Sequence, residues 1–238
     1  MSASRPESVL IVTPCSASKR HRATDEPSFE DLVDKDRRAA AFERLANLAL
    51  PACEMYAGQH HRAVLKAVDR LRSGWPATRI DIVVVSAGYG IIDEHEFIVP
   101  YNATFAGLPS AVAIARTERL RIRSALRQRL ADYEVGVFLL SERYLDVLEP
   151  PFEAAPQELY FAPPGLRLLG KGVLHIPAGV EESGALAVAP RMVRAALFQR
   201  FVDLALREAW SETLELALDQ RRFVEPRERP VQLSLSIS

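Results

Sequence analysis

The amino-acid sequence predicts an α/β fold with a mostly parallel central sheet and helices on both of its faces. Residues 9–13 are all apolar or β-branched, and residues 80–86 contain three consecutive valines, which is the pattern of strands covered on both sides. Stretches with helical periodicity alternate with these and other strand candidates, as in parallel sheets. With 238 residues, 48% of them hydrophobic, the chain can bury a sizeable core. We expect one α/β domain over residues 1–222 and a tail over 223–238.

The first half of the chain begins with the strand 9–13, which ends at a proline that has no N–H for the sheet ladder. Residues 19–34 are polar, and we expect a long irregular loop there, as in many lids and binding segments. Residues 36–50 place apolar side chains at helical spacing and stop before a proline. The short stretch 52–56 is a strand candidate, and residues 59–73 resume the helical spacing.

The second half contains the clearest strand, 80–86, with three consecutive valines and a glycine-rich turn after it. Residues 98–108 combine apolar side chains with Pro, Asn and Gly, which favours an ordered loop at the sheet edge. The other predicted elements are a long helix over 110–130, strands over 134–141, 157–162 and 172–178, a short helix over 143–148, and a helix or helix pair over 190–222. The tail fits an edge strand, a partner-binding segment or a disordered end.

Composition excludes several classes of protein. The 30 basic and 31 acidic side chains give a net charge of −1, which excludes a globally cationic nucleic-acid coat. Two cysteines are too few for a disulfide framework, and residues 1–8 lack the apolar core of a secretion signal, so we expect a cytoplasmic setting. No apolar stretch approaches the roughly 20 residues needed to cross a bilayer. Neither the cysteines nor His60 and His61 have zinc-ligand spacing, and we expect no metal and no cofactor.

Three loops that follow predicted strands or precede predicted helices carry most of the reactive side chains. Ligands in open α/β sheets bind beyond the carboxyl ends of the strands. We therefore expect residues 14–22, 56–61 and 86–93 to meet at one edge of the sheet, joined by residues 141–144.

These loops contain the strings T-P-C-S-A-S-K, M-Y-A-G-Q-H and V-V-S-A-G-Y-G-I-I-D, and a P-Y pair follows. They resemble the C-S-x-x-K, Y-x-G-x-H and S-A-x-Y-G-L-[IL] elements of a family of small, uncharacterised bacterial and phage domains related to the peroxide stress protein YaaA. The likeness covers residues 9–108, with a weaker echo at F-L-L-S-E-R-Y, residues 138–144. The first string is also similar to the P-C-S-x-x-K start of a motif in archaeosine synthase, whose later portion is missing here.

The resemblance implies a YaaA-like α/β core associated with nucleic acid, DNA more than RNA, or with modified nucleobases. We expect the loops at the strand ends to form a substrate pocket, lined by Ser16, Lys19, Arg20, Tyr56, Gly58, Ser86, Tyr89, Gly90 and Tyr101. The helix-hairpin-helix DNA-binding element of YaaA has no clear counterpart in the sequence.

Cys15, His61 and Asp93 are the candidates for a reactive role. A cysteine among basic side chains has a stabilised thiolate that can attack an electrophilic carbon, and the alternative is a small residue packed under the loop. A histidine can act as acid or base near neutral pH, although a pair at a helix start is often a surface feature. Asp93 could position a water or cap the following turn.

Other side chains fit substrate binding. Lys19 and Arg20 suit either a phosphate or carboxylate cradle or a solvated surface run. Tyr89, between two glycines, suits either a stacking platform for a base or a core tyrosine that locks the turn. Cys53 lies within a strand candidate and is expected in the core.

The predicted helix 110–130 carries the strongest nucleic-acid signal. Arg116, Arg119, Arg123 and Arg127 fall on one side of it, which suits a phosphate backbone or, alternatively, a solvated face paired with acids. We therefore expect an enzyme that acts on a modified nucleobase or nucleotide, by glycosidic-bond cleavage or base transfer. The alternatives are a non-catalytic DNA- or RNA-binding stress-response protein and a small-molecule nucleotide hydrolase or transferase.

Overall fold

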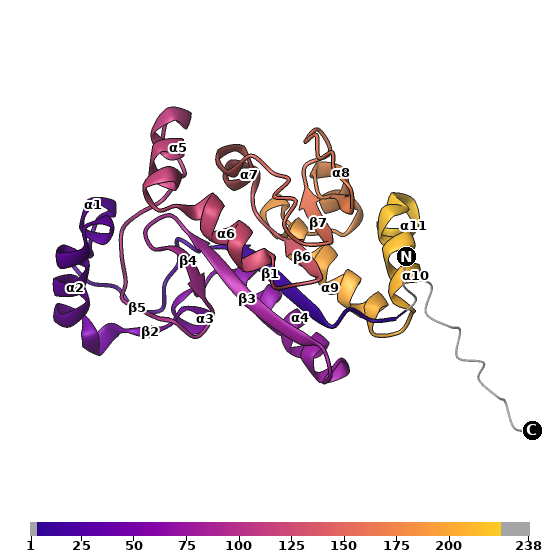
Figure 1. The fold of residues 1–238 in the computed structure, drawn as a ribbon, viewed down its shortest axis with the longest axis horizontal. Helices are drawn as coiled ribbons and strands as arrows, with labels where there is room; N and C mark the ends of the chain where they lie inside the picture. The colour runs from indigo at the N-terminus through magenta and orange to yellow at the C-terminus, as the bar shows by residue number, and fades with distance from the viewer. Residues whose placement is uncertain (1–3, 225–238) are drawn as a thin grey trace, which may run out of the picture.

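The computed structural model describes residues 4–224 and contains a six-stranded, mostly parallel sheet with helices (Figure 1). The strand order is β4-β3-β1-β6-β7-β8, and only the β3–β4 pair is antiparallel. The strands of this sheet are β1 (Ser8–Pro14), β3 (Arg79–Ser86), β4 (Gly90–Asp93), β6 (Val135–Phe138), β7 (Gln157–Ala162) and β8 (Val173–Pro177). A separate antiparallel pair joins β2 (Leu50–Pro51) and β5 (Phe97–Ile98). The predicted α/β class with a mostly parallel sheet is confirmed.

The helices differ widely in length, and only some of them cover the sheet. They are α1 (Phe29–Val33), α2 (Lys35–Arg44), α3 (Ala52–Met55), α4 (Gln59–Gly74), α5 (Ser110–Arg119), α6 (Ile122–Leu130), α7 (Glu142–Leu148), α8 (Val180–Ala185), α9 (Val193–Ala205), α10 (Trp210–Leu218) and α11 (Gln220–Val224). Single 3₁₀ turns cover Ala46–Leu48 and Pro190–Met192. In Figure 1, α1, α2, β2 and β5 lie at one end of the molecule, and α10 and α11 lie at the other.

Alternate residues of β1 build the cores on the two faces of the sheet. Val9 and Ile11 pack in the cluster formed with α4, α9 and α10, while Leu10 and Val12 pack in the cluster formed with α5, α6 and α7. All four side chains are at most 2% exposed. The central strand is therefore apolar throughout, which explains the unbroken pattern in the sequence.

Residues 52–56 do not form the predicted strand. They form the short helix α3, because Ala52 and Cys53 donate their backbone N–H groups to the carbonyls of Glu96 and Glu94 outside any ladder of the main sheet. Cys53 is half-buried, so the prediction that it belongs to the core is wrong. The predicted loop 19–34 also contains a helix, α1, whose N-terminus is capped by Ser28 and Asp31 in a reciprocal capping box.

The predicted helix 110–130 is two helices. Arg121 takes a left-handed backbone conformation with φ of 51°, which ends α5 and starts α6 in a new direction. Arg116 and Arg119 lie on α5, whereas Arg123 and Arg127 lie on α6, so the predicted stripe along one helix is wrong.

Three further boundaries differ from the predictions. The glycine turn after β3 leads into β4, because Gly90, with φ of 84°, reverses the chain onto the edge of the sheet. A helix, α8, lies between β8 and α9 where none was predicted. The expected tail begins inside α11, since Phe223 and Val224 are helical and Phe223 is buried. The remainder of the tail lies outside the described residues.

Glu158 anchors the loop before β7. Its carboxylate is buried and accepts hydrogen bonds from the backbone N–H groups of Phe152 (3.1 Å) and Ala154 (2.8 Å) and from the Tyr160 hydroxyl (2.6 Å). A buried carboxylate is stable only with such donors, and the donors in turn depend on it.

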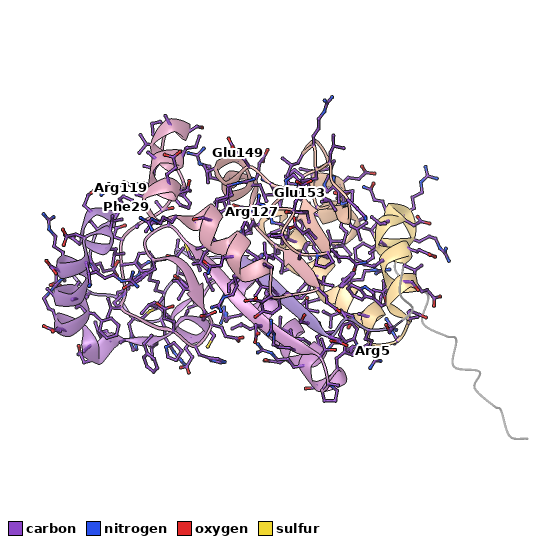
Figure 2. The ribbon with its side chains drawn as sticks, viewed as in Figure 1. Arg5, Phe29, Arg119, Arg127, Glu149 and Glu153 are labelled. Carbon is purple, nitrogen blue, oxygen red and sulfur yellow. The ribbon has the colours of Figure 1, made fainter. Side chains whose placement is uncertain are left out.

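We expect Glu158→Gln to lower the free energy of unfolding by about 3 kcal/mol. The NH₂ group of the glutamine cannot accept hydrogen bonds, so the donors that face it would lose their acceptor. Glu153→Gln is the matched control, since Glu153 lies exposed in the same loop (Figure 2), and it should change stability by less than about 0.5 kcal/mol. Urea unfolding measures both values, and equal losses would contradict the anchoring role of Glu158.

Candidate functional site

Two adjoining hollows lie where β1 and β6 end. The Cys15 hollow has a volume of about 280 Å³ and is lined by Pro14, Cys15, Ser16, Ala17, Gly58, His60, His61, Ser141, Tyr144, Arg191 and Arg194. The Ser18 hollow has a volume of about 500 Å³ and shares Ser16, Ala17, Gly58, His60 and Arg191 with it. Small-molecule sites typically have volumes of about 300–1,000 Å³, so the two hollows together have the size of a ligand site.

Close approach of two loops forms the common wall. A Cβ atom at Gly58 would lie 2.3 Å from the Ser16 hydroxyl oxygen and 3.1 Å from the Ser16 Cβ, so any larger residue would force the Ser16 side chain to move. Ala57 donates its N–H to the carbonyl of Ser18 (2.9 Å), and Arg20 donates to the carbonyl of Met55 (2.8 Å). The structure therefore brings the segments 14–22 and 56–61 together.

Cys15 lies one residue beyond β1, and its sulfur is 3.0 Å from the hydroxyl oxygen of Tyr144. Burial, followed by the negative charge that Cys15 can carry, raises the pKa of Tyr144 well above its ordinary value. The phenol therefore keeps its proton at neutral pH and can donate it in a hydrogen bond to the sulfur. Such a bond would place a hydrogen-bond donor directly on the sulfur.

A second set of hydroxyl groups lies buried behind Cys15. The Ser86 oxygen accepts the backbone N–H groups of Gly88 (3.2 Å) and Tyr89 (3.1 Å), which occupies its lone pairs, so its own proton goes to the Tyr101 hydroxyl (2.8 Å). Tyr101 in turn donates to the Tyr56 hydroxyl (2.9 Å). Three of the residues expected to line the pocket, Ser86, Tyr101 and Tyr56, thus form one hydrogen-bonded chain, all of it within 1% exposure.

His60 and His61 line the Cys15 hollow as uncharged rings at neutral pH. Burial lowers the pKa of each to about 4, helped at His60 by the positive charge of Arg194. His61 is 2% exposed, and neither of its ring nitrogens has a hydrogen-bond partner among the described residues. The Cys53 carbonyl is near enough to favour the charged ring but not placed for a full hydrogen bond. The wall of the hollow therefore contains an imidazole whose two nitrogens are buried and have no partner among the described residues.

Positive charge gathers at both hollows. Arg191 and Arg194 line the Cys15 hollow, and Arg62 lines the Ser18 hollow beside Arg191. No Asp or Glu side chain lines either one. The N-terminus of α4 also opens here, and no side chain caps it at Gly58. These features suit an anionic ligand.

Lys19 and Arg20 do not line either hollow. The Lys19 ammonium lies 4.0 Å from the centre of the Tyr101 ring, turned toward the core, and burial lowers its pKa while the negative charge of Cys15 opposes that shift. Arg20 is exposed and pairs with Glu54 at 3.3 Å. Lys19 and Arg20 therefore do not form an anion cradle at the hollows, where the basic side chains are Arg62, Arg191 and Arg194.

The other candidates from the glycine turn also lie apart from the hollows. Tyr89 is buried, with its ring 5.1 Å from that of Tyr101 and its face covered by Arg38, so it is a core tyrosine and offers no free face for a base. Gly90 is buried at the β3–β4 turn. Asp93 is exposed and forms an ion pair with Arg129. The structure does not bring Asp93 together with Cys15 and His61.

Most of the arginines on α5 and α6 have partners within the protein. Arg119 binds Glu30 with both terminal nitrogens, at 3.0 and 2.9 Å, and lies over Phe29 (Figure 2). Arg116 also lies over the Phe29 ring. Arg123 donates to the carbonyls of Leu148 and Glu149. Arg127 is exposed and lines a separate hollow of about 460 Å³ between α5, α6 and α7.

Sequence reasoning missed three residues of the Cys15 hollow. Tyr144 was expected only as part of the joining segment 141–144, whose weak S-E-R-Y echo was the available signal. Arg191 and Arg194 had no local signal, because α9 reaches the hollow only through its packing against α4.

Comparisons with known proteins add no assignment. A scan against protein-family models finds no match for this chain, and a search of curated proteins finds none. Within residues 4–224, no helix has the length and apolar character of a membrane span, and no three or more His, Cys, Asp or Glu side chains are grouped to hold a metal ion.

We expect His61→Phe to flatten the dependence of stability on pH. The folded pKa of about 4 lies below the ordinary 6.5, so the unfolded chain binds more protons between these values and wild-type stability falls as pH drops from 6.5 to 4. Phenylalanine keeps an aromatic ring but cannot bind a proton, so the decrease in stability at low pH that His61 causes should disappear. Stability at neutral pH should not fall, because the His61 nitrogens have no hydrogen-bond partners among residues 4–224. Urea unfolding at both pH values measures the effect, with His95→Gln as an exposed control. Parallel pH profiles for wild type and His61→Phe would contradict it.

We expect Tyr144→Phe to slow alkylation of Cys15 at neutral pH by about threefold to tenfold, because the thiolate loses a hydrogen-bond donor. The remaining thiolate is somewhat more nucleophilic, which offsets only part of this decrease in rate. Mass spectrometry after iodoacetamide treatment measures the rate at each cysteine. Cys53 serves as an internal control and should react at an unchanged rate. An unchanged rate at Cys15 would show that Tyr144 does not stabilise its thiolate.

Proposed function

We propose that the protein is an enzyme that acts on a nucleobase or nucleotide in the Cys15 hollow, by cleavage of a glycosidic bond or transfer of a base. The base belongs to DNA, to RNA or to a free nucleotide, and a YaaA-like core in a cytoplasmic protein is part of the proposal. Modified bases are the first substrates to test.

One observation carries the proposal: the Cys15 sulfur lies in contact with a protonated phenol in a hollow that arginines line and carboxylates do not. A thiolate with a hydrogen-bond donor beside it is an activated nucleophile. Positive charge around it favours a substrate that carries phosphate.

The chemistry follows from these groups. The Cys15 thiolate forms a bond to the anomeric carbon of the sugar, the bond from that carbon to the base breaks, and the base nitrogen leaves with the electron pair. The base nitrogen takes up a proton from solvent as it leaves, because His61, with a pKa of about 4, is uncharged at neutral pH and the attacking thiolate has no proton to give. Water then breaks the carbon–sulfur bond for cleavage, or a second base does so for transfer, and the thiolate is restored.

A second candidate is a hydrolase or transferase that acts on free nucleotides only. Arg116, Arg119 and Arg123, which were expected to hold a nucleic-acid backbone, contact groups within the protein, while the arginines at the hollows face a confined space. This distribution of charge favours a small ligand over a polymer. A non-catalytic nucleic-acid-binding protein would instead use the exposed arginines.

The test is release of free bases from modified DNA, from tRNA and from a nucleotide pool, each followed by mass spectrometry. We expect wild type to release a base from at least one of them and Cys15→Ala to lose activity by at least about a hundredfold, because the nucleophile is absent. The mass of the intact protein should increase by one sugar-containing adduct on Cys15.

Cys53→Ala is the matched control, since it removes the other thiol from a half-buried position outside the hollows and should retain activity. Turnover that survives Cys15→Ala would end the nucleophile proposal. Salt-sensitive binding to DNA or RNA without base release would favour the non-catalytic alternative.

A further inference from the structure

Arg194 lies at the start of α9, half-buried, and its guanidinium has no hydrogen-bond or ion-pair partner among residues 4–224. Its Nε atom is buried and makes no hydrogen bond, and none of the described residues forms an ion pair or hydrogen bond with this side chain. Glu142 acts on it only through space, and burial lowers its pKa. Only the Nε atom is fully buried, so the terminal nitrogens remain accessible from the hollow, where an anion from solution can pair with the charge.

Neighbouring groups point toward the same space. Arg191 lies three residues earlier and keeps an ordered position by donating to the Gln59 side chain at 3.3 Å. The uncapped N-terminus of the 16-residue helix α4 directs its free N–H groups there. His61, buried with both nitrogens unpartnered, lines the same hollow.

We propose that Arg194, Arg191 and the N-terminus of α4 form the subsite for a phosphate monoester, the terminal phosphate of a free nucleotide. Two guanidinium groups and a helix N-terminus match the charge of a phosphate dianion and its three terminal oxygens. A terminal phosphate monoester carries more negative charge than a phosphodiester inside a strand, so it pairs better with two guanidinium groups. The assignment to a nucleotide rests on the proposed function, whereas the phosphate site itself does not.

The subsite also orients the substrate. Arg194 and Cys15 line one hollow of about 280 Å³, so a phosphate held by the arginine places the attached sugar within the space beside the sulfur. Remote binding energy of this kind positions the reacting carbon for attack.

The experiment measures binding of inorganic phosphate, adenosine 5′-monophosphate, adenosine and single-stranded oligo(dA) by calorimetry, and the thermal midpoint with each. We expect both phosphate ligands to bind and raise the midpoint, and adenosine to do neither. Arg194→Met should weaken phosphate binding by about tenfold or more, because a charge-assisted hydrogen bond is lost. Arg194→Lys, which keeps the charge, should weaken it less.

Arg127→Met is the matched control, since it removes the same charge from an exposed position on α6 and should leave phosphate binding unchanged (Figure 2). Without ligand, Arg194→Met should be at least as stable as wild type, because it removes an unpaired, half-buried charge. A destabilised Arg194→Met protein would identify a structural arginine and overturn the proposal.

The phosphate-subsite proposal would also be overturned if neither phosphate ligand binds, or if Arg194→Met leaves phosphate binding intact. It would be overturned as well if oligo(dA) binds in a way that depends on Arg194 while the monophosphate does not bind. Binding is measured in Cys15→Ala as well, so that it does not depend on turnover. Phosphate binding without base release would refute the proposed reaction and support the phosphate subsite. Base release without phosphate binding would support the reaction and refute the subsite.

Discussion

The parallel pairing of β1 with β3 on one side and β6 on the other is the constraint on which the candidate site depends. Because both neighbours hydrogen-bond to β1, its side chains are committed alternately to two cores, and the chain leaves the sheet only after Pro14. The ladder continues for one more bond, from the N–H of Cys15 to the Val85 carbonyl (3.0 Å). The position of the sulfur is thus set by backbone pairing and not by a flexible loop.

Much of the fold was predictable because the buried strands are rich in apolar and β-branched side chains. Residues 9–13 and 80–86 needed no tertiary information, since each is covered on both faces. Residues 52–56 were not predictable in the same way: a short apolar stretch has the same composition in a strand and in a single helical turn. The break at Arg121 also left no mark in the sequence, because a left-handed arginine has no composition signal.

Site residues next to a predicted strand or helix could be located from the sequence, whereas residues positioned by packing between distant segments could not. Cys15 directly follows a strand, so its position at the carboxyl edge could be inferred from the sheet alone. Gly58 and His61 were expected there after a strand over residues 52–56, which is a helix in the structure, and they reach the edge nonetheless. Lys19 was misplaced because the direction of a long side chain depends on what it can cover, here the Tyr101 ring. Arg194 could not be found, since its position depends on helix packing between segments far apart in the chain.

The hydroxyl chain from Ser86 through Tyr101 to Tyr56 has a polarity that the backbone dictates. Two peptide N–H groups saturate the serine oxygen, so every proton along the chain points outward from β3, and the outermost one, on Tyr56, has no further recipient within it. Cys15 is the titratable group whose charge acts most strongly on that phenol. The backbone of the sheet therefore fixes the orientation of these protons before any ligand arrives. Because Tyr56 is buried and lines neither hollow, a ligand there can sense this dipole only across the intervening protein.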